Sequence, residues 1–248
     1  MEEQLRFFLK SVESYNSILN GELYDYSKAI WIAHISFIEN YLKNFNEIVI
    51  YKGFWSGYEL YQKPYYRFIS DVDFFVSDEN YKKLREFFLD LKFNYYFQFS
   101  NKIPKFIKNS LEYEMAFSKN LLNFEVHRRL FPPYFIEIDS KKLLKRVVEW
   151  KFNLLTFPIE EQFIISVLHF YKSSQKIFYW LWDIFILLTL VDFKKIKEIC
   201  NYYSIDYEKF IKILEEIKIG KFVRRNLFFK KNFKNYLTFF AFKLFSKL

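Results

Sequence analysis

Strand-like runs are confined to one stretch of this chain, and helical patterns lie on both sides of it. The first run, Glu47–Tyr51, is rich in β-branched residues and stops at a Lys-Gly turn. The second, Phe68–Val76, places alternate side chains on opposite faces. Three more strands are expected at 93–99, 111–118 and 121–127. A group of strands followed by helices alone predicts an α+β fold.

Helices are expected wherever apolar residues recur at helical spacing. Residues 3–45 are expected to form two helices that break at Gly21. Ser77-Asp78 is a capping signal for a helix that ends near Leu91. Beyond Pro132-Pro133, helices are expected at 160–172, 177–191 and 193–218. The order divides the chain into N-terminal helices at 1–45 that pack on the next part, a small α+β domain at 46–150, and a helical domain at 151–248 with a basic aromatic tail.

The composition indicates a compact protein rich in helix. Apolar residues make up 52% of the chain and aromatic residues 24%, with only 4 Gly and 5 Pro, whereas disordered chains are poor in aromatics. Cys200 stands alone, which excludes an internal disulfide or a thiolate metal cluster. The acidic start Met1-Glu2-Glu3 is unlike a signal peptide. The longest apolar run, Ile177–Val191, is too short and carries Asp183, so a cytoplasmic protein without a transmembrane segment is expected.

Two acids, Asp71 and Asp73, lie inside the second strand-like run. Side chains at i and i+2 of a strand point the same way, so their oxygens can share one or two divalent cations. Mg²⁺ prefers such hard oxygen ligands and keeps sites free for water and phosphate. An Asp-x-Asp motif by itself is weak, because solvated strand ends also produce it, but the apolar run Phe74–Val76 beside it favours a functional role.

A third acid, Glu125, lies on another short strand, Leu122–His127. A neighbouring strand can bring its carboxylate beside Asp71 and Asp73, which makes it a candidate catalytic residue and metal ligand. A Glu that merely faces solvent from an edge strand is an equal alternative. His127 shares a face with Glu125 and is expected either to orient it or to contact substrate, with a structural histidine as the alternative.

Four further residues are candidates for binding a phosphate chain such as that of a nucleotide. Gly53 ends the first strand, where a glycine lets the backbone approach phosphate, and Lys52 beside it supplies charge. Arg67 can neutralise a triphosphate or pair with a carboxylate, and Ser70 directly precedes the acidic pair. The combination of these residues is more informative than any one of them.

Three motifs carry a resemblance to the uncharacterised nucleotidyltransferase family of the polymerase-beta superfamily. They are Lys52-Gly53, the run Arg67-Phe-Ile-Ser-Asp71-Val-Asp73, and Phe124-Glu125-Val-His127. Later residues resemble the helical part of that family: Glu160-Glu161, His169 and Trp180-Leu-Trp-Asp183. The resemblance covers roughly residues 45–190. It implies the minimal nucleotidyltransferase fold, a mixed sheet with flanking helices, for the part at 46–150, and the helical pattern beyond residue 150 predicts an all-helical domain after it.

The resemblance also implies an activity and its cofactor. The family moves a nucleoside monophosphate from a nucleoside triphosphate to an acceptor hydroxyl, with Mg²⁺ or Mn²⁺, in two ions, held by Asp71, Asp73 and Glu125. The acceptor is a small molecule, a protein or an RNA. The wider superfamily has Gly-Ser or Gly-Gly where this chain has Gly53-Phe54. A toxin-type nucleotidyltransferase of an abortive-infection system shares the Lys-Gly start, and a catalytically weak module that binds RNA or another anionic partner is a further alternative.

Two features outside these motifs also carry expectations. His169 and Asp183 lie on consecutive apolar helices and are expected to form a structural hydrogen-bonded pair between them. The formal charge of +9 consists mostly of lysine, which an AT-rich genome also produces. Residues 220–248 contain basic and aromatic residues without an acid, and they are expected either to pack on the helical domain or to bind a polyanion weakly.

Overall fold

A seven-stranded mixed sheet forms the centre of the protein. The computed structural model describes residues 22–43, 45–96, 112–133, 135–173 and 178–218. The strands are β1 (Val49–Tyr51), β2 (Val72–Phe75), β3 (Asn94–Tyr96), β4 (Glu114–Lys119), β5 (Leu122–His127), β6 (Val148–Glu149) and β7 (Leu155–Thr156), in the spatial order β3-β4-β5-β2-β1-β7-β6. β2 pairs with β5 and β1 with β7 in parallel, and the other neighbours are antiparallel.

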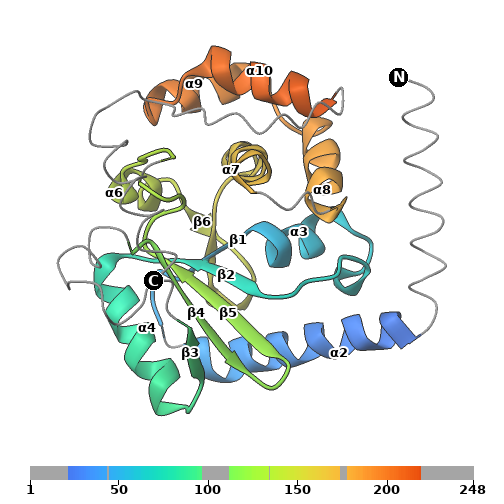
Figure 1. Ribbon diagram of the computed structural model, residues 1–248, viewed down its shortest axis with the longest axis vertical. Coiled ribbons are helices and arrows are strands. Elements are labelled where there is room, and N and C mark those ends of the chain that lie inside the picture. The colour runs from blue at the N-terminus through green and yellow to red at the C-terminus, as the bar shows by residue number, and fades with distance from the viewer. Residues whose placement is uncertain (1–21, 44, 97–111, 134, 174–177, 219–248) are drawn as a thin grey trace, which may run out of the picture.

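Helices cover both faces of the sheet (Figure 1). They are α2 (Glu22–Phe37), α3 (Lys52–Leu60), α4 (Asp78–Asp90), α6 (Ser140–Leu144), α7 (Ile159–Lys172), α8 (Phe178–Leu188), α9 (Phe193–Tyr202) and α10 (Tyr207–Lys218). A π-helical turn, Ile38–Leu42, continues α2, and short 3₁₀ turns lie at Pro64–Tyr66 and Lys151–Asn153. α2 and α4 lie on one side of the sheet, and α7 to α10 lie on the other. The expected α+β class, with a mixed sheet and C-terminal helices, is confirmed.

The face toward α2 and α4 is packed with aromatic rings. Phe124 of β5 lies 4.9 Å from Phe37 and 5.2 Å from Phe88, measured between ring centroids. Phe74 of β2 stacks on Phe124 at 5.4 Å. Offset and edge-on contacts of this kind stabilise a core beyond the area that they bury. The alternate residues of β2 and β5 therefore have to point to the other face, and these residues carry the charges.

The N-terminus of α4 follows the expected capping pattern. Ser77 accepts a hydrogen bond through Oγ from the backbone N–H of Asn80 at 3.2 Å, and Asp78 and Glu79 occupy the first turn. A serine cap and acidic residues both stabilise a helix N-terminus. The helix ends at Asp90, within one residue of the position predicted from the sequence.

The sheet continues beyond the strands expected from the sequence. β7 pairs in parallel with β1, and the N–H of Leu155 donates to the carbonyl of Ile48 at 2.9 Å. Thr156 donates through its hydroxyl to the carbonyl of Ile50 at 2.8 Å and accepts from the Gln162 amide of α7 at 2.9 Å. This polar contact ties the start of α7 to the sheet. The division into domains at 150 stays a prediction, although the sheet itself reaches residue 156.

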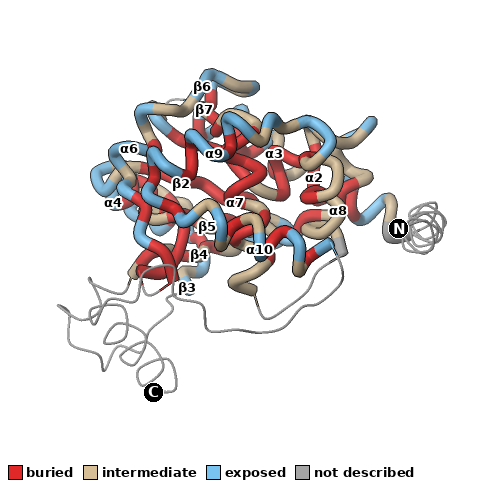
Figure 2. Tube along the Cα trace, turned by 90° about the horizontal axis from the view of Figure 1, so that it is seen from above, coloured by how far each residue is buried: buried red, intermediate tan, exposed pale blue. Residues whose placement is uncertain are grey.

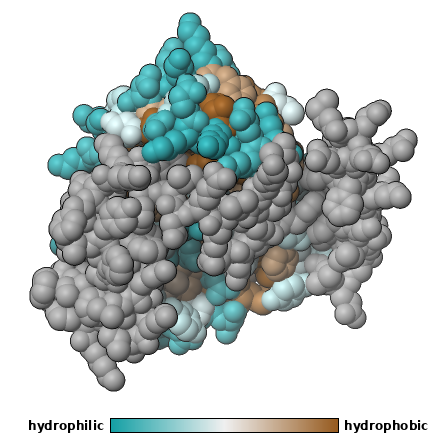
Figure 3. Space-filling view, turned by 45° about the horizontal axis from the view of Figure 1, so that its top comes forward, coloured by the Kyte–Doolittle hydropathy of each residue, from teal (hydrophilic) through white to brown (hydrophobic). Residues whose placement is uncertain are grey.

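The C-terminal helices pack around α7. Apolar residues of α9 and α10 face inward, among them Ile196, Phe210 and Leu214, all nearly inaccessible to solvent. Figure 2 shows buried segments running through the sheet and α7. Figure 3 shows hydrophilic residues over much of the described surface on the side of α9 and α10, as expected for amphipathic helices. A search of the described helices found none with the length and apolar character needed to cross a bilayer.

Candidate active site

The carboxylates of Asp73 and Glu125 meet on the face of the sheet that α7 covers. Asp73 on β2 is the register partner of Glu125 on the parallel strand β5. Cross-strand partners point to the same face of a sheet. Asp73 is 8% exposed and Glu125 34%, so one acid lies at the bottom of the site and the other near its opening. Asp71, half-buried, lies just before β2.

His127 joins the two acids from the same strand as Glu125. Its Nε2 lies 3.0 Å from Oδ1 of Asp73 and 3.4 Å from Oε2 of Glu125. One ligand atom from each of the three residues lies within 4.8 Å of the others. The imidazole is 1% exposed. His127 therefore lies at the centre of the site. The sequence predicted a role beside Glu125, and the structure places His127 in contact with Asp73 as well.

Lys52 neutralises part of this charge. It adopts a left-handed backbone conformation, with φ of 55°, which ends β1 and starts α3 without a connecting loop. Its Nζ lies 2.7 Å from Oδ1 of Asp73. Burial lowers the pKa of the ammonium, but Asp73 and Glu125 outweigh this effect and raise the pKa above its ordinary value. The lysine is therefore charged and lies against the acids, as its candidate role requires.

The pKa values of Asp71 and Asp73 are shifted in opposite directions. Burial together with the charges of Asp73 and Glu125 raises the pKa of Asp71 to about 7. Burial also acts to raise the pKa of Asp73, but Lys52 and His127 hold it well below its usual range. The site thus concentrates more negative charge than its own lysine compensates, which is the condition that a bound cation relieves.

The donor set fits a divalent cation. Two ligand atoms about 2.1 Å from one ion and at right angles to each other are about 3 Å apart. The spacings of 3.0 and 3.4 Å around Nε2 of His127 are close to this value. Asp73, Glu125 and His127 can therefore share an ion with little movement. Asp71, the other acid expected to bind metal, lies outside this group of three and interacts with Asp73 and Glu125 through its charge.

Ser70 and Arg67, both expected at the nucleotide, have different positions. Ser70 donates through Oγ to Oδ1 of Asp71 at 3.1 Å, so it orients that acid at the exposed rim. Arg67 is 4% exposed, and its Nη2 lies 2.8 Å from Oδ2 of Asp183 on α8. Tyr61 donates to the other oxygen of Asp183 at 2.9 Å. Of the two roles considered for Arg67, the structure shows pairing with a carboxylate, because the guanidinium is buried between α3 and α8.

Glycine is also required at position 53 for a structural reason that the motif did not indicate. A Cβ at this position would lie 2.9 Å from Nη1 of Arg67, so glycine leaves space for the buried guanidinium. Phe54, the next residue, is fully buried and stacks on Trp31 at 4.7 Å. Close approach of the Gly53 backbone to phosphate stays a prediction.

The expected pair of His169 and Asp183 is wrong. Both oxygens of Asp183 accept hydrogen bonds, from Arg67 and Tyr61. His169 instead contacts the Trp180 ring edge-on at 4.6 Å, and among the described residues its Nδ1 has no hydrogen-bond partner. Helical spacing indicated that both residues face a neighbouring element, but it did not indicate which element each residue contacts.

Three residues of the site did not emerge from the sequence: Glu114 of β4, Tyr51 of β1 and Lys172 of α7. Glu114 is the register partner of His127, with Oε2 at 3.4 Å from Nδ1. Tyr51 is the register partner of Asp73 and is fully buried. Burial lowers the pKa of Lys172, whose ammonium lies over the Tyr113 ring. The alternation of Glu114, Ala116 and Ser118 with the large apolar residues Met115 and Phe117 was the available signal for the first of them.

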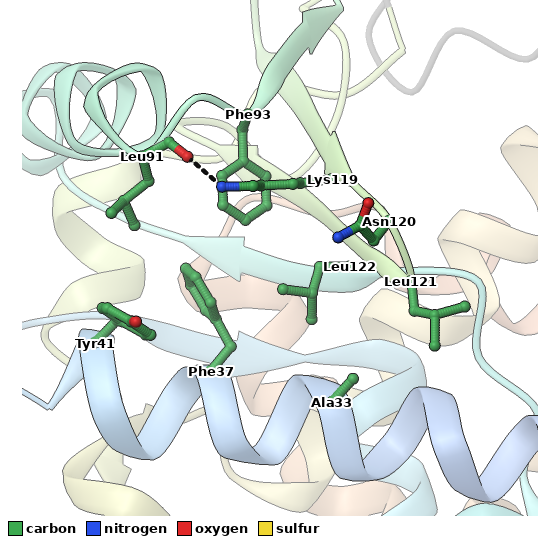
Figure 4. Close-up of a pocket in the computed structure, with 9 residues that line it drawn as sticks. All are labelled: Ala33, Phe37, Tyr41, Leu91, Phe93, Lys119, Asn120, Leu121 and Leu122. Carbon is green, nitrogen blue, oxygen red and sulfur yellow. Dashed lines mark hydrogen bonds between the residues drawn. The ribbon is translucent and has the colours of Figure 1, made fainter.

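A cavity elsewhere in the protein is separate from this site. It measures about 360 Å³ and lies on the opposite face of the sheet, between α2 and the hairpin of β4 and β5. Figure 4 shows Phe37 of α2 facing Phe93, with Tyr41 of the π-helical turn beside Phe37 and with Lys119 donating to the carbonyl of Leu91 at 2.7 Å. Its lining contains no carboxylate or histidine side chain, so it does not offer the chemistry of the acidic site.

Comparison with known proteins gave one family. A family model described as an uncharacterised nucleotidyltransferase matches residues 37–233, which include the sheet, the acids and the helices as far as α10. No curated protein and no solved structure matched the chain. The family resemblance of the sequence motifs is thereby confirmed. The basic segment 220–248, where weak polyanion binding was expected, lies outside the described residues.

Proposed function

The chain belongs to the uncharacterised nucleotidyltransferase family, and we propose that it transfers a nucleoside monophosphate from a nucleoside triphosphate to an acceptor hydroxyl. The observation that carries this proposal is the register of β2 and β5, which sets Asp73 beside Glu125 on one face. Nucleotidyl transfer requires acids that hold cations against phosphate, and this face offers them with His127 and Lys52 in contact. The products are the nucleotidylated acceptor and pyrophosphate.

Asp71, Asp73 and Glu125 hold the cations in this proposal, Mg²⁺ or Mn²⁺, as two ions. A bound divalent cation neutralises developing charge on phosphate and lowers the pKa of a coordinated hydroxyl. Asp73 lies at the buried end, where Lys52 and His127 fix its carboxylate. Ser70 fixes Asp71 at the rim. The chain therefore preorganises its acids before substrate arrives, which is the main protein contribution to phosphoryl transfer.

The triphosphate is placed at the N-terminus of α3. The free N–H groups of a first helical turn attract anions. α3 begins at Lys52, whose ammonium already lies at the acids, so helix terminus and charge meet at one point. The N–H of Lys52 itself faces Oε1 of Gln162 at 3.4 Å. In this arrangement the N–H groups after Lys52 and the lysine ammonium bind phosphate oxygens in place of the Gly-Ser turn of the wider superfamily.

The transfer step itself is a displacement at phosphorus. The acceptor oxygen forms a bond to the α-phosphorus while the bond from that phosphorus to the bridging oxygen breaks, and pyrophosphate leaves with the bonding electrons. Glu125, the more exposed acid, either ligates a cation or takes the proton of the acceptor hydroxyl. The acceptor is a small molecule, a protein side chain or an RNA end.

A screen of nucleotides tests this function. Purified protein is incubated with each of the four ribonucleoside triphosphates, Mg²⁺ or Mn²⁺, and a cell extract as the source of acceptor, and pyrophosphate is measured. We expect release with at least one nucleotide, and transfer of an α-³²P label to an acceptor. Asp73→Asn should abolish both signals. Absence of release under every condition, from folded protein, would favour a binding module built on the same fold.

A further inference from the structure

We propose that His127 is a direct ligand of the metal ion and that Glu114 supports it from behind, so that the site favours a transition-metal ion such as Mn²⁺ over Mg²⁺. The inference rests on the proposed function only for the presence of a divalent cation at Asp73. It adds a nitrogen ligand, a supporting acid and a metal preference that three carboxylates alone would not give.

The imidazole of His127 points toward both acids of the site. Nε2 of His127 faces the two carboxylates, at 3.0 Å from Asp73 and 3.4 Å from Glu125. A histidine that only supported one acid would need a single contact of this kind. Here one ring nitrogen lies close to two acids at the spacing of ligands around one ion.

The other ring nitrogen of His127 faces a carboxylate on the neighbouring strand. Metal-bound histidines usually direct the nitrogen that is not bound to metal toward a carboxylate or carbonyl, which fixes the ring and makes the ligand more basic. Nδ1 of His127 has Oε2 of Glu114 at 3.4 Å, an ion-pair distance, but the contact lacks hydrogen-bond geometry, and Nδ1 has no hydrogen-bond partner among the described residues. Glu114 lies directly opposite His127 in the β4–β5 pairing, so the sheet register fixes this relationship. The Glu114 carboxylate on β4, the His127 imidazole on β5 and the ion site at Asp73 on β2 thus lie in a row across three adjacent strands.

A buried hydroxyl beside the site gives independent support for a bound ion. The Tyr51 side chain is fully buried, and its Oη has no hydrogen-bond partner among the described residues. Tyr51 is in register with Asp73, and its ring contacts that of His127 edge-on at 5.7 Å. Buried polar atoms are rarely left without a partner. An unpaired hydroxyl on the same face as the acids and His127 indicates that a hydrated ion or a ligand belongs there.

The preference for Mn²⁺ over Mg²⁺ follows from the donor atoms. Mg²⁺ demands oxygen ligands in near-ideal octahedral geometry, whereas imidazole nitrogen binds transition metals well. Asp73, Glu125 and His127 form a mixed set of oxygen and nitrogen donors. Mn²⁺ accepts both kinds, and ions later in the first transition series bind such sites more tightly. A histidine ligand therefore raises affinity for Mn²⁺ without a matching gain for Mg²⁺.

Electron spin echo spectroscopy of bound Mn²⁺ tests the ligand directly. We expect nitrogen modulation in the wild-type spectrum and a change in its pattern when histidine is labelled with ¹⁵N. His127→Gln should remove the modulation, and the matched control His34→Gln, a buried histidine that contacts α2 and β5 on the other face, should keep it. Mn²⁺ bound to the wild-type protein without nitrogen modulation would overturn the proposal and leave the proposed function intact.

Calorimetric titration with each metal provides the second measurement. The ratio of Mn²⁺ to Mg²⁺ affinity should fall about tenfold or more in His127→Gln, and Glu114→Gln should weaken Mn²⁺ binding by about 10- to 100-fold while nitrogen modulation remains. An unchanged ratio in a folded His127→Gln protein contradicts the proposal. Failure of wild-type protein to bind Mn²⁺ at all overturns both this inference and the metal-dependent function, whereas nitrogen modulation without nucleotidyl transfer overturns only the function.

Discussion

Lys52 and Asp73 form an ion pair, with 2.7 Å between Nζ and Oδ1, in which the two side chains are 10% and 8% exposed. The lysine precedes Gly53 at the turn that superfamily members use for phosphate, yet its ammonium contacts an acid of the cation site. Lysine and metal therefore compete for one oxygen. Binding of cation and nucleotide would move Lys52 from carboxylate to phosphate.

Lys52→Met should raise the affinity of the nucleotide-free protein for Mn²⁺ on the order of tenfold. The reason is that one unit charge a few ångströms from another contributes about 1 kcal/mol even in water, and more at a partly buried site. Calorimetric titration measures the change, and Lys82→Met on the exposed side of α4 is the control. The same variant should weaken nucleotide binding. Equal or lower Mn²⁺ affinity in Lys52→Met would refute the competition.

The buried ion pair of Arg67 and Asp183 should dominate the attachment of α8 to α3. Removing one partner of a buried pair leaves an uncompensated charge, which typically costs about 3–5 kcal/mol. We therefore expect Asp183→Leu and Arg67→Met each to lower the free energy of unfolding by about that amount in urea titrations. The double variant should be clearly more stable than the sum of the single effects predicts. Strict additivity would show that the pair is not coupled.

His34 should make the protein less stable as the pH falls. Its imidazole is buried, with Nδ1 2.8 Å from the carbonyl of Ile30 and Nε2 3.1 Å from the carbonyl of Asn123. Burial lowers the pKa of His34 below 6.5 despite these hydrogen bonds. The unfolded chain therefore binds a proton before the folded chain does. Stability that is fully present above the unfolded pKa near 6.5 is lost progressively as the pH falls from there through the lower folded pKa.

Urea unfolding of metal-free protein at pH 7.5, 6.5 and 5.5 measures this effect. The wild type should lose more stability than His34→Gln over this range, by at most about 1.4 kcal/mol per pH unit, the limit for one proton. The comparison of the two proteins cancels the titration of His127 and His169. Parallel profiles of stability against pH for the two proteins would contradict the prediction that His34 causes this loss of stability.

The sequence predicted those parts of the fold that depend on local pattern. Ser77-Asp78 gave the start of α4, and the β-branched run before Lys52 gave β1. β7 escaped prediction because it has two residues, and its pairing with β1 depends on partners more than 100 residues away. No periodicity exists in a strand of that length. The sheet order likewise depends on long-range packing that a single sequence does not reveal.

The candidate site was predictable where spacing along a strand fixes direction. Asp73, Glu125 and His127 face one another because each lies on the polar face of a short strand. Arg67 and Asp183 were assigned other partners, since a charged residue on an apolar element shows only that it needs a partner. Their contact joins residues 116 apart in the chain. That distance is outside what motif spacing or helical period can specify.

The most direct test of the whole account is metal-dependent nucleotidyl transfer by Asp73→Asn, compared with wild type and with Glu86→Gln. Glu86 is an exposed acid on α4 that takes no part in the site. With the nucleotide that gives release in the screen, and with folding checked by thermal unfolding, pyrophosphate release is measured against Mn²⁺ concentration. The account predicts release by wild type and Glu86→Gln and at least about a hundredfold loss in Asp73→Asn, comparable with the removal of one preorganised electrostatic group. Release by folded Asp73→Asn at the wild-type rate would contradict it.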